Sequence, residues 1–358
     1  MSSNFMRACV FLLALFVSVI YIFRNQDVNP NIIKHQKRLE TEALLIQTPP
    51  SPAPTRQCAL PAITQEANAG RGSVTYVCES SSSCGGLADR VRGISAAYMY
   101  ALMLNRSFHI SMPNMHLEEF LQPRLHAWNI PAPSPASKRF VAIDDVRTLD
   151  LCEWQQHLHL EVATNQWTPG AFLHADCPEW HTQHARELLS ALFTAPPTAQ
   201  HYIKEFPCIG SVFNLLFEPT EQVLNALRIE RQRVPAPSIG IHFREGDIAM
   251  LPGQSDQRGR SFDLCMAEAR RAVSPATVYV VSDSWDTKMR VANETDVLIS
   301  PAVPFHVDKS VYERLRVLEL FVDLFMLASM DAIVITPSGF GALAATMGAY
   351  TSNHIHYC

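Results

Sequence analysis

The chain has 358 residues, a formal net charge of -5 and a hydrophobic content of 47%. This length is sufficient for two domains of ordinary size. The acidic balance, with no stripe of Lys and Arg along any predicted helix, excludes nucleic acid as a partner. A two-lobed globular protein is therefore the first expectation.

Residues 8–23 (ACVFLLALFVSVIYIF) form an apolar segment without a charge, between Arg7 and Arg24. As a helix it would span about 24 Å, which is short but compatible with the thinner membranes of the early secretory pathway. A cleaved signal peptide is the alternative, but the residues that follow the apolar run offer no small-x-small cleavage site. Residues 1–24 are therefore predicted to be a short cytosolic tail and an uncleaved signal-anchor helix.

Two signals of opposite sense indicate on which side of the membrane the rest of the chain lies. More basic residues follow the apolar segment than precede it, which favours the cytosol. The eight cysteines outside the segment form an even set that suits an oxidising lumen, although eight free thiols in the cytosol would give the same count. Glycosylation sequons at Asn105 and Asn293 also fit the lumen. Together these features predict a single-pass type II membrane protein with a lumenal domain. The Golgi is the expected compartment.

Residues 25–72 lack a sustained apolar period and contain a proline-rich run at 48–55, so they are predicted to form an extended stem. A strand at 74–78, a helix at 87–104 and a strand at 108–111 follow. This βαβ succession favours a parallel sheet. A proline-rich loop at 131–135 and helices around 184–193 and 220–233 complete a first lobe, residues 73–233.

Strands and helices alternate more clearly in a second lobe, residues 234–358. Strands are predicted at 238–243, 277–282 and 332–336, and the β-branched runs of the last two are typical of strands buried on both faces. Helices are predicted at 262–273, 314–329 and 341–348. We therefore expect an α/β fold of two Rossmann-like lobes with a cleft between them, and a ligand beyond the carboxyl ends of the strands.

The segment 241–247 (IHFREGD) joins a buried strand to a cluster of charged residues. Arg244 offers a rigid fork of donors that suits phosphate oxygens and never loses its charge, so it could hold a departing nucleoside diphosphate. A structural ion pair among Arg244, Glu245 and Asp247 is the alternative. From this segment alone the two interpretations have equal weight.

A second anion-binding segment is predicted where the strand 332–336 runs into residues 337–341 (PSGFG) and a helix of small residues. Free backbone N–H groups at a helix start, together with the Ser338 hydroxyl, form a natural seat for an anion. The segment is neither a Walker loop nor G-x-G-x-x-G, so an ordinary turn between strand and helix is the alternative.

With the strand 278–283 between them, these two segments resemble in order and spacing the three motifs of the GDP-fucose-dependent fucosyltransferases, including the α1,2, α1,6 and protein O-fucosyltransferase branches. The resemblance implies a GT-B-like fold in which Arg244 of a His-x-Arg-x-x-Asp motif binds the diphosphate. It also implies that Asp323 recognises guanine through its N1 and N2 hydrogens. An exposed helix residue is the alternative for Asp323, although its neighbours are apolar. The implied donor-binding residues are His242, Arg244, Asp247, Asp283, Asp323, Ser338, Gly339 and Phe340.

Residues 85–93 (GGLADRVRG) are similar to the Gly-Gly-Leu loop that follows the first strand in this superfamily, on the acceptor side of the cleft. The residues concerned are Gly85, Gly86, Asp89 and Arg90. Asp89 is the candidate that takes a proton from an acceptor hydroxyl, beside Arg244 as the other candidate catalytic residue. A first-turn residue that stabilises the helix dipole is the simpler interpretation of Asp89.

The motifs also depart from the family pattern. Glu245 stands where the α1,2 and α1,6 branches place a second basic residue, which leaves the branch open. The chain has no Asp-x-Asp and no zinc-ligand spacing, so neither a metal nor another cofactor is expected. The resemblance implies inverting, metal-independent transfer of L-fucose from GDP-fucose to a hydroxyl of a glycan or glycoprotein. A transferase for another nucleotide sugar and an inactive lumenal binding protein are the alternatives.

Overall fold

The computed structural model describes residues 72–79, 84–130, 139–142, 159–163, 209–246, 255–274, 276–304, 307, 313–348, 350 and 354–358. The predicted signal-anchor, the stem, the loop at 131–135 and the helix around 184–193 lie outside these residues. Among the helices that the structure describes, none has both the length and the apolar character that crossing a membrane requires.

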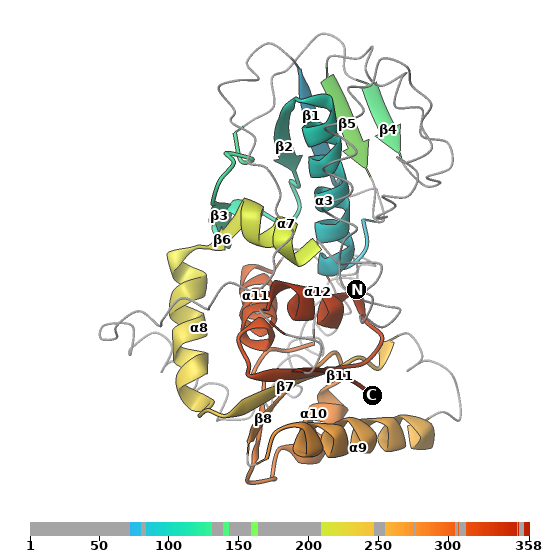
Figure 1. Cartoon of the computed structure of the whole chain (residues 1–358), viewed down its shortest axis with the longest axis vertical. Coiled ribbons are helices and arrows are strands. Elements are labelled where there is room, and N and C mark those ends of the chain that lie inside the picture. Colours follow the sequence, from blue (N-terminus) through green and yellow to red (C-terminus); the bar gives the residue numbers. More distant parts are fainter. Residues whose placement is uncertain are drawn as a thin grey trace, which may run out of the picture. The chain divides into compact units, whose positions relative to one another are not determined.

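The first sheet has four parallel strands in the order β2-β1-β5-β4 (Figure 1). Its strands are β1 (Ser73–Val77), β2 (Ser107–Ser111), β4 (Arg139–Ala142) and β5 (His159–Ala163). Val74 in the middle of the sheet pairs with Phe108 on one side and with Leu160 on the other. The helix α3 (Leu87–Leu104) joins β1 to β2 and packs on β1. The predicted βαβ unit is therefore confirmed.

The ends of α3 are fixed by local hydrogen bonds. At its start, the Asp89 carboxylate accepts a hydrogen bond from the Gly86 N–H at 3.0 Å, which satisfies a backbone donor that the helix cannot pair. Gly85 precedes it with a φ of +73°, a conformation that favours glycine. At its end, Asn105 adopts the left-handed conformation with a φ of 51°, and its N–H reaches the carbonyls of Ala101 and Leu102. Such a residue terminates a helix.

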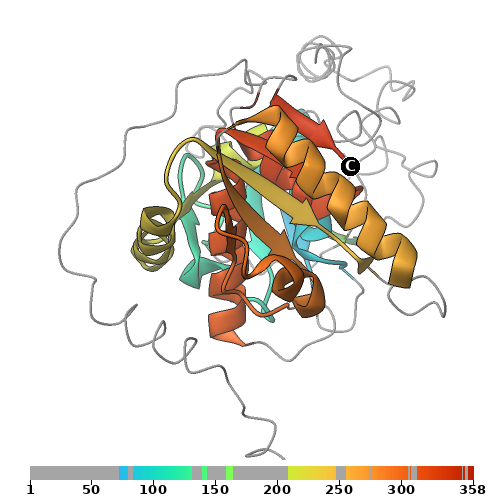
Figure 2. The ribbon, with the colours of Figure 1, turned by 90° about the horizontal axis from the view of Figure 1, so that it is seen from below.

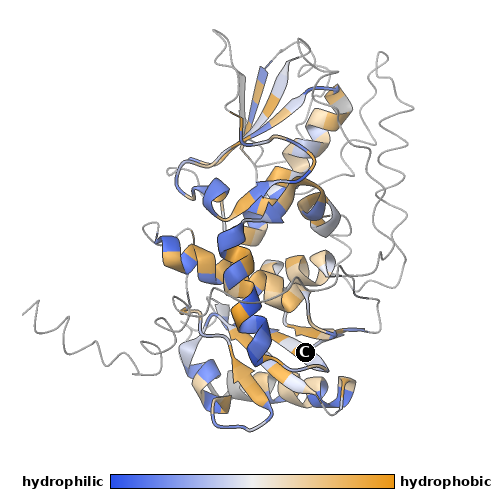
Figure 3. Cartoon of the chain, turned by 90° about the vertical axis from the view of Figure 1, so that its left-hand side faces the viewer, coloured by the Kyte–Doolittle hydropathy of each residue, from blue (hydrophilic) through white to orange (hydrophobic). Residues whose placement is uncertain are grey.

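A short antiparallel pair links two distant parts of the chain. The strand β3 (Leu121–Pro123), which follows the 3-10 helix η2 (Leu117–Glu119), pairs with β6 (Phe217–Pro219). Two helices flank β6, namely the apolar α7 (Ile209–Leu216) and the largely hydrophilic α8 (Glu221–Arg233) (Figure 3). The buried Trp128 donates its indole N–H to the Leu216 carbonyl at 2.9 Å, which fastens the end of α7 to this region.

The second sheet has five parallel strands in the order β11-β10-β7-β8-β9. They are β7 (Ser238–Phe243), β8 (Thr277–Ser282), β9 (Val297–Ile299), β10 (Ala332–Ile335) and β11 (Ile355–Tyr357). The helices α11 (Arg314–Ala328) and α12 (Gly339–Met347) cover one face. The other face is covered by α9 (Ser255–Ala272) and α10 (Trp285–Val291) (Figures 1 and 2).

Alternate residues along the strands of the second sheet belong to two different hydrophobic cores, one on each face of the sheet. Ile239 and Val280 pack with Phe262 of α9, whereas Tyr279 and Ile333 belong to the core that contains α11 and α12. Because successive strand residues point to opposite faces, two covered faces require the uninterrupted apolar runs seen in the sequence. The predicted strands are confirmed. Two helices begin earlier than predicted, α9 at residue 255 and α12 at residue 339.

The larger core is continuous from the first sheet to the second. It includes Val74 and Phe108 of the first sheet and Ile333 of the second, with α7 between them. α7 makes many contacts with α12 and fewer with α3. At the crossing, a Cβ added to Gly210 would lie 2.2 Å from the Thr346 carbonyl group. The backbones of the two helices are therefore in direct contact at this point.

Two disulfides lie among the described residues. One joins Cys78 to Cys84, just after β1 and just before α3. The other joins Cys265 of α9 to Cys358, which follows β11. The remaining cysteines of the predicted even set lie outside the described residues.

Candidate functional site

A pocket lies at the carboxyl ends of β7 and β8, where the first turns of α3 and α12 meet. A Cβ added to Gly339 would lie 3.2 Å from the Cβ of Ala88, so the two helix starts are in contact. This is the position at which open parallel sheets bind their ligands. The predicted site residues that line the pocket are Gly86, Asp89, His242, Arg244, Asp283, Asp323, Ser338, Gly339 and Phe340.

Arg244 follows the last residue of β7 at the mouth of the pocket. Its backbone N–H donates to the Thr336 hydroxyl at 3.0 Å, which fixes the chain beyond the strand. The side chain is 38% exposed, and its Nε lies 3.9 Å from an Asp283 carboxylate oxygen. An ion pair so long and so exposed is weak, so the guanidinium can still bind an anion in the pocket.

Asp283 shapes the turn that carries Arg244. Its two carboxylate oxygens accept hydrogen bonds from the N–H groups of Glu245 at 2.8 Å and Gly246 at 3.0 Å. Gly246 has a φ of +64°. The contact of Asp283 with a donor stays a prediction, while the structure shows Asp283 holding the turn. Asp247, the last residue of the first motif, lies outside the described residues.

His242 and Ser338 place two buried polar atoms at the pocket wall. The side chains are 5% and 4% exposed respectively, and neither His242 Nδ1 nor Ser338 Oγ has a hydrogen-bond partner within the described part of the chain. Burial lowers the pKa of His242 to about 3, and the charges of Arg244 and Lys288 act in the same direction. The ring is therefore neutral at physiological pH. Because unpaired buried polar groups are costly, these atoms favour a polar ligand.

Phe340 completes this wall, with its ring centroid 5.2 Å from that of His242. Gly339 and Phe340 lie in the first turn of α12, not in a loop before it as predicted, because the helix begins at Gly339. Ser338 is its N-cap but makes no side-chain capping bond. The N–H groups of this turn lack helical partners, so the amino end of α12 favours an anion.

Asp323 is a buried carboxylate that also lines the pocket. It is 5% exposed, so the alternative of an exposed helix residue is excluded. Its Oδ1 accepts hydrogen bonds from Ser300 Oγ at 2.6 Å and the Tyr279 hydroxyl at 3.3 Å. Oδ2 accepts none from the residues that the structure describes. Burial raises the pKa of Asp323 to about 6, and the positive charge of Lys288 opposes that shift.

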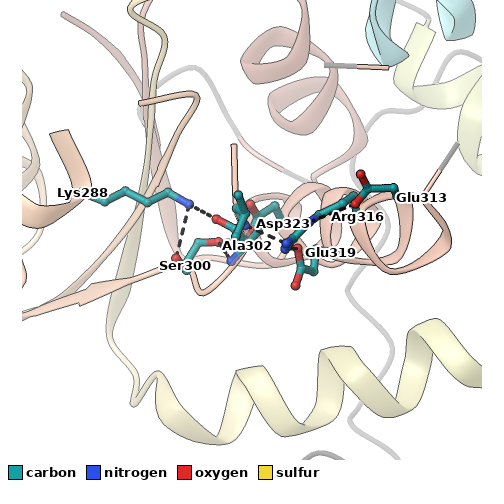
Figure 4. Close-up of polar contacts among 8 residues, drawn as sticks. Lys288, Ser300, Ala302, Glu313, Arg316, Glu319 and Asp323 are labelled. Atoms are coloured by element: carbon teal, nitrogen blue, oxygen red, sulfur yellow. Dashed lines mark hydrogen bonds and ion pairs between the residues drawn. The ribbon is translucent and has the colours of Figure 1, made fainter. Parts of the chain in front are cut away.

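Many of the other side chains that line the pocket are apolar. Side chains of this kind suit a flat ring whose edge meets a few polar groups. Arg316 also lines the pocket and pairs with Glu319 at 2.9 Å and Glu313 at 3.6 Å (Figure 4). The apolar wall residues are Val281, Ala302, Val303, Pro304, Val307 and Leu320.

On the side predicted to face the acceptor, Asp89 lines the pocket and caps α3. One carboxylate oxygen accepts from the Gly86 N–H, and the other lies 3.7 Å from Arg92 Nη1. The side chain is 38% exposed. Arg90 is buried, donates to the Gly85 carbonyl at 3.1 Å and does not line the pocket. The structural interpretation of Asp89 thus has direct evidence, and its catalytic role stays a prediction.

Sequence reasoning missed Lys288, which lines the pocket and is only 1% exposed. Its helix, α10, was not predicted, and a lysine in a short helix is usually exposed. The one local signal is Ser284, whose hydroxyl accepts from the Thr287 N–H as the N-cap of α10. No group of three or more His, Cys, Asp or Glu side chains that could hold a metal ion occurs among the residues described.

No family model and no curated protein sequence matches the chain. Solved structures do match. A mutant of FUT1 from Arabidopsis thaliana in complex with GDP aligns with a TM-score of 0.54 and 14% identity, over 77% of this chain and 69% of that chain. The described fold is thus shared with this GT-B-like structure. Also similar are fucosyltransferase NodZ from Bradyrhizobium (TM-score 0.44, 13% identity, 78% and 93% covered) and POFUT1 in complex with GDP-fucose (0.45, 11%, 82% and 99%).

Proposed function

We propose that this chain is a glycosyltransferase that transfers L-fucose from GDP-fucose to a hydroxyl of a glycan or glycoprotein. The observation that carries the proposal is the pocket. It combines Arg244 at a strand end, the buried carboxylate Asp323 and the unpartnered atoms of His242 and Ser338. The fold shared with FUT1, whose structure holds GDP, supports the choice of nucleotide.

Arg244 and the first turn of α12 would hold the diphosphate. Arginine can donate two parallel hydrogen bonds to phosphate oxygens, and the helix start adds unpaired N–H groups and a partial positive charge. Negative charge grows on the diphosphate as the bond to the sugar breaks, so donors already in place stabilise the transition state more than the ground state. These groups supply positive charge without a metal ion.

Asp323 would recognise the base. An ionised carboxylate can accept hydrogen bonds from both N1 and N2 of guanine, a pair of neighbouring donors that adenine and uracil do not offer. The apolar wall residues would enclose the ring. Asp323 and Arg244 line the same pocket, as recognition of a base and a diphosphate in one nucleotide requires.

The transfer itself would invert the sugar. The acceptor oxygen attacks C1 of fucose, the bond from C1 to the β-phosphate oxygen breaks, and GDP leaves with the electron pair. The Asp89 carboxylate would take the acceptor proton. One of its oxygens is engaged by the Gly86 N–H, and a protonated carboxyl keeps an acceptor for that bond. Capping α3 is therefore compatible with a role as base.

A donor screen on the full-length protein in detergent tests this function. We expect release of GDP from GDP-fucose, and none of UDP or CMP from UDP- and CMP-sugars, with the rate largely unchanged in EDTA. GDP-mannose is the matched control, since it differs only in the sugar. Release from a UDP-sugar, a CMP-sugar or GDP-mannose alone would indicate a transferase for another donor. Tight GDP binding without turnover across a panel of glycan acceptors would indicate a binding protein.

We further propose that this domain lies in the Golgi lumen. Disulfides persist in oxidising compartments, and the two described ones support this location. Both sequon asparagines, Asn105 and Asn293, are exposed. In sealed microsomes the large domain should resist added protease until detergent is present. Complete digestion without detergent would contradict the topology.

A further inference from the structure

Lys288 is a buried cation beside the site proposed for the base. Its ammonium group donates hydrogen bonds to the backbone carbonyls of Ala302 at 2.6 Å and Ser300 at 3.3 Å (Figure 4). A lysine this deeply buried is rare, because its charge loses the solvation of water. Two carbonyl groups alone do not balance the full positive charge of the ammonium group, so a negatively charged group is needed as well.

The carbonyls that Lys288 binds belong to the segment that positions Asp323. Ser300 accepts a hydrogen bond from the Ala302 N–H at 3.1 Å and donates its hydroxyl to Asp323 Oδ1 at 2.6 Å. Lys288 holds the backbone of this segment, and the Ser300 hydroxyl holds the carboxylate. The position of Asp323 therefore depends on Lys288 through two successive hydrogen bonds.

The charges around Asp323 come from several elements. Two acidic side chains face it, Glu230 of α8 and Glu319 of its own helix, and each raises its pKa. Each of these acids pairs with an arginine, Glu230 with Arg233 at 2.6 Å and Glu319 with Arg316 at 2.9 Å. The Tyr279 hydroxyl, which donates to Asp323, is uncharged, and so is the ring of His242, which lines the same pocket.

Lys288 differs from these arginines because its hydrogen bonds end on carbonyl oxygens. Burial lowers the pKa of Lys288, and Asp323 is the negative group that most opposes this shift. Lys288 is likewise the group that does most to oppose the effect of burial on Asp323. The two charges thus balance one another across the segment at residues 300–302.

We propose that Lys288 is a positioning residue that keeps the Asp323 carboxylate ionised and aimed into the pocket, and so sets the preference for a base with two adjacent N–H donors. The inference rests on the proposed use of a guanine nucleotide. It identifies Lys288 as the residue that makes the Asp323 carboxylate selective for that base. A protonated Asp323 would present an O–H donor to the guanine donors and could not accept both. Without Lys288, burial, Glu230 and Glu319 all favour protonation.

The variant that tests this is Lys288→Gln. A glutamine amide can still donate to the carbonyls of Ser300 and Ala302 but carries no charge, so it separates the charge of Lys288 from its support of the backbone. Lys288→Met removes both and is the second variant. Arg290→Met is the matched control, since Arg290 lies on the same helix, is 45% exposed and pairs with Asp263 away from the pocket. Thermal melting of each full-length protein shows whether it folds.

Binding of GDP and of inosine diphosphate, which lacks the N2 amino group, is measured by calorimetry from pH 5 to 8. In Lys288→Gln the pH below which GDP binding weakens should rise by about one unit or more, as expected on removing a nearby opposite charge. At pH 6.5 the preference for GDP over inosine diphosphate should fall about tenfold. Arg290→Met should leave both quantities unchanged.

A purely structural role for Lys288 would weaken both nucleotides equally at every pH. If a folded Lys288→Gln or Lys288→Met protein keeps the wild-type pH midpoint and GDP preference, the inference is overturned while the proposed function remains. If the wild-type protein binds ADP or UDP as well as GDP at pH 7.5, the proposed guanine site is wrong and the inference falls with it.

Discussion

Arg244 tests the donor site at the scale of one residue. Arg244→Lys keeps the charge but loses the planar pair of donors that grips a diphosphate. Turnover of GDP-fucose should fall by roughly 10²-fold or more, comparable to the loss of one donor to a developing oxyanion. The melting temperature should hardly change, since the pair of Arg244 with Asp283 is long and exposed. Near-normal turnover would refute the diphosphate assignment.

Asp323 connects recognition with stability. Its pKa is about 6 in the folded protein and about 3.9 when unfolded. The folded state therefore binds the proton more tightly. The tighter binding of this proton adds to the free energy of unfolding. The addition is fully present below about pH 4 and is lost as pH rises through 6. Asp323→Asn should thus raise the free energy of unfolding at pH 7.5 by ~2–3 kcal/mol, with little gain at pH 4.

Urea unfolding at the two pH values measures this difference, and nucleotide binding on the same samples measures its functional cost. We expect a more stable protein that no longer prefers GDP. Equal effects on stability at pH 4 and pH 7.5 would show that the ionised carboxylate is not strained by burial in the native state.

Only part of this site is predictable from the sequence. The abrupt change from a buried strand to charged residues indicates Arg244, and the apolar neighbours of Asp323 indicate its burial. Lys288 has no such signal. Its burial depends on carbonyl groups from a segment 12 and 14 residues further along the chain, and no local pattern encodes that contact.

At the scale of elements, the crossing of α7 and α12 depends on Gly210. Alanine has the higher helix propensity, by about 1 kcal/mol, yet the added Cβ would lie 2.2 Å from the Thr346 backbone. The helices would have to separate, so we expect Gly210→Ala to lower stability by about 1–3 kcal/mol or more. Gly86→Ala is the control, because its Cβ would meet only an Asp89 oxygen at 3.8 Å. Urea unfolding compares them, and a stabilised Gly210→Ala protein would contradict the close crossing.

The longer elements are predictable and the shorter ones are not. The runs of β7, β8 and β10 and the helix α11 are long enough to show their period and their residue preferences. The three-residue strands β3, β6, β9 and β11 are too short to show any period. β3 and β6 in addition pair across almost a hundred residues, so their partners cannot be read locally. The early start of α12 escapes prediction because glycines open the helix.

At the scale of the molecule, the continuous core predicts joint unfolding. α7 packs on α3 and on α12, and these helices share one buried core with residues of both sheets, so opening one sheet exposes apolar surface of the other. Hydrogen exchange followed by mass spectrometry should give β1 and β8 the same free energy of opening, equal to that of global unfolding. A much lower free energy of opening for β1 than for β8 would show two independent domains.

The shared core also sets an order of events during synthesis. α7 leaves the ribosome well before its main partner α12, and its side chains Val212, Phe213 and Leu216 are almost completely buried in the finished protein. Until residues 339–347 have emerged, these side chains lack the part of their native cover that α12 supplies. A growing chain arrested before α12 should therefore hold an exposed apolar helix, and chaperones bind such surfaces. Packing around α7 would be completed only after α12 has been made.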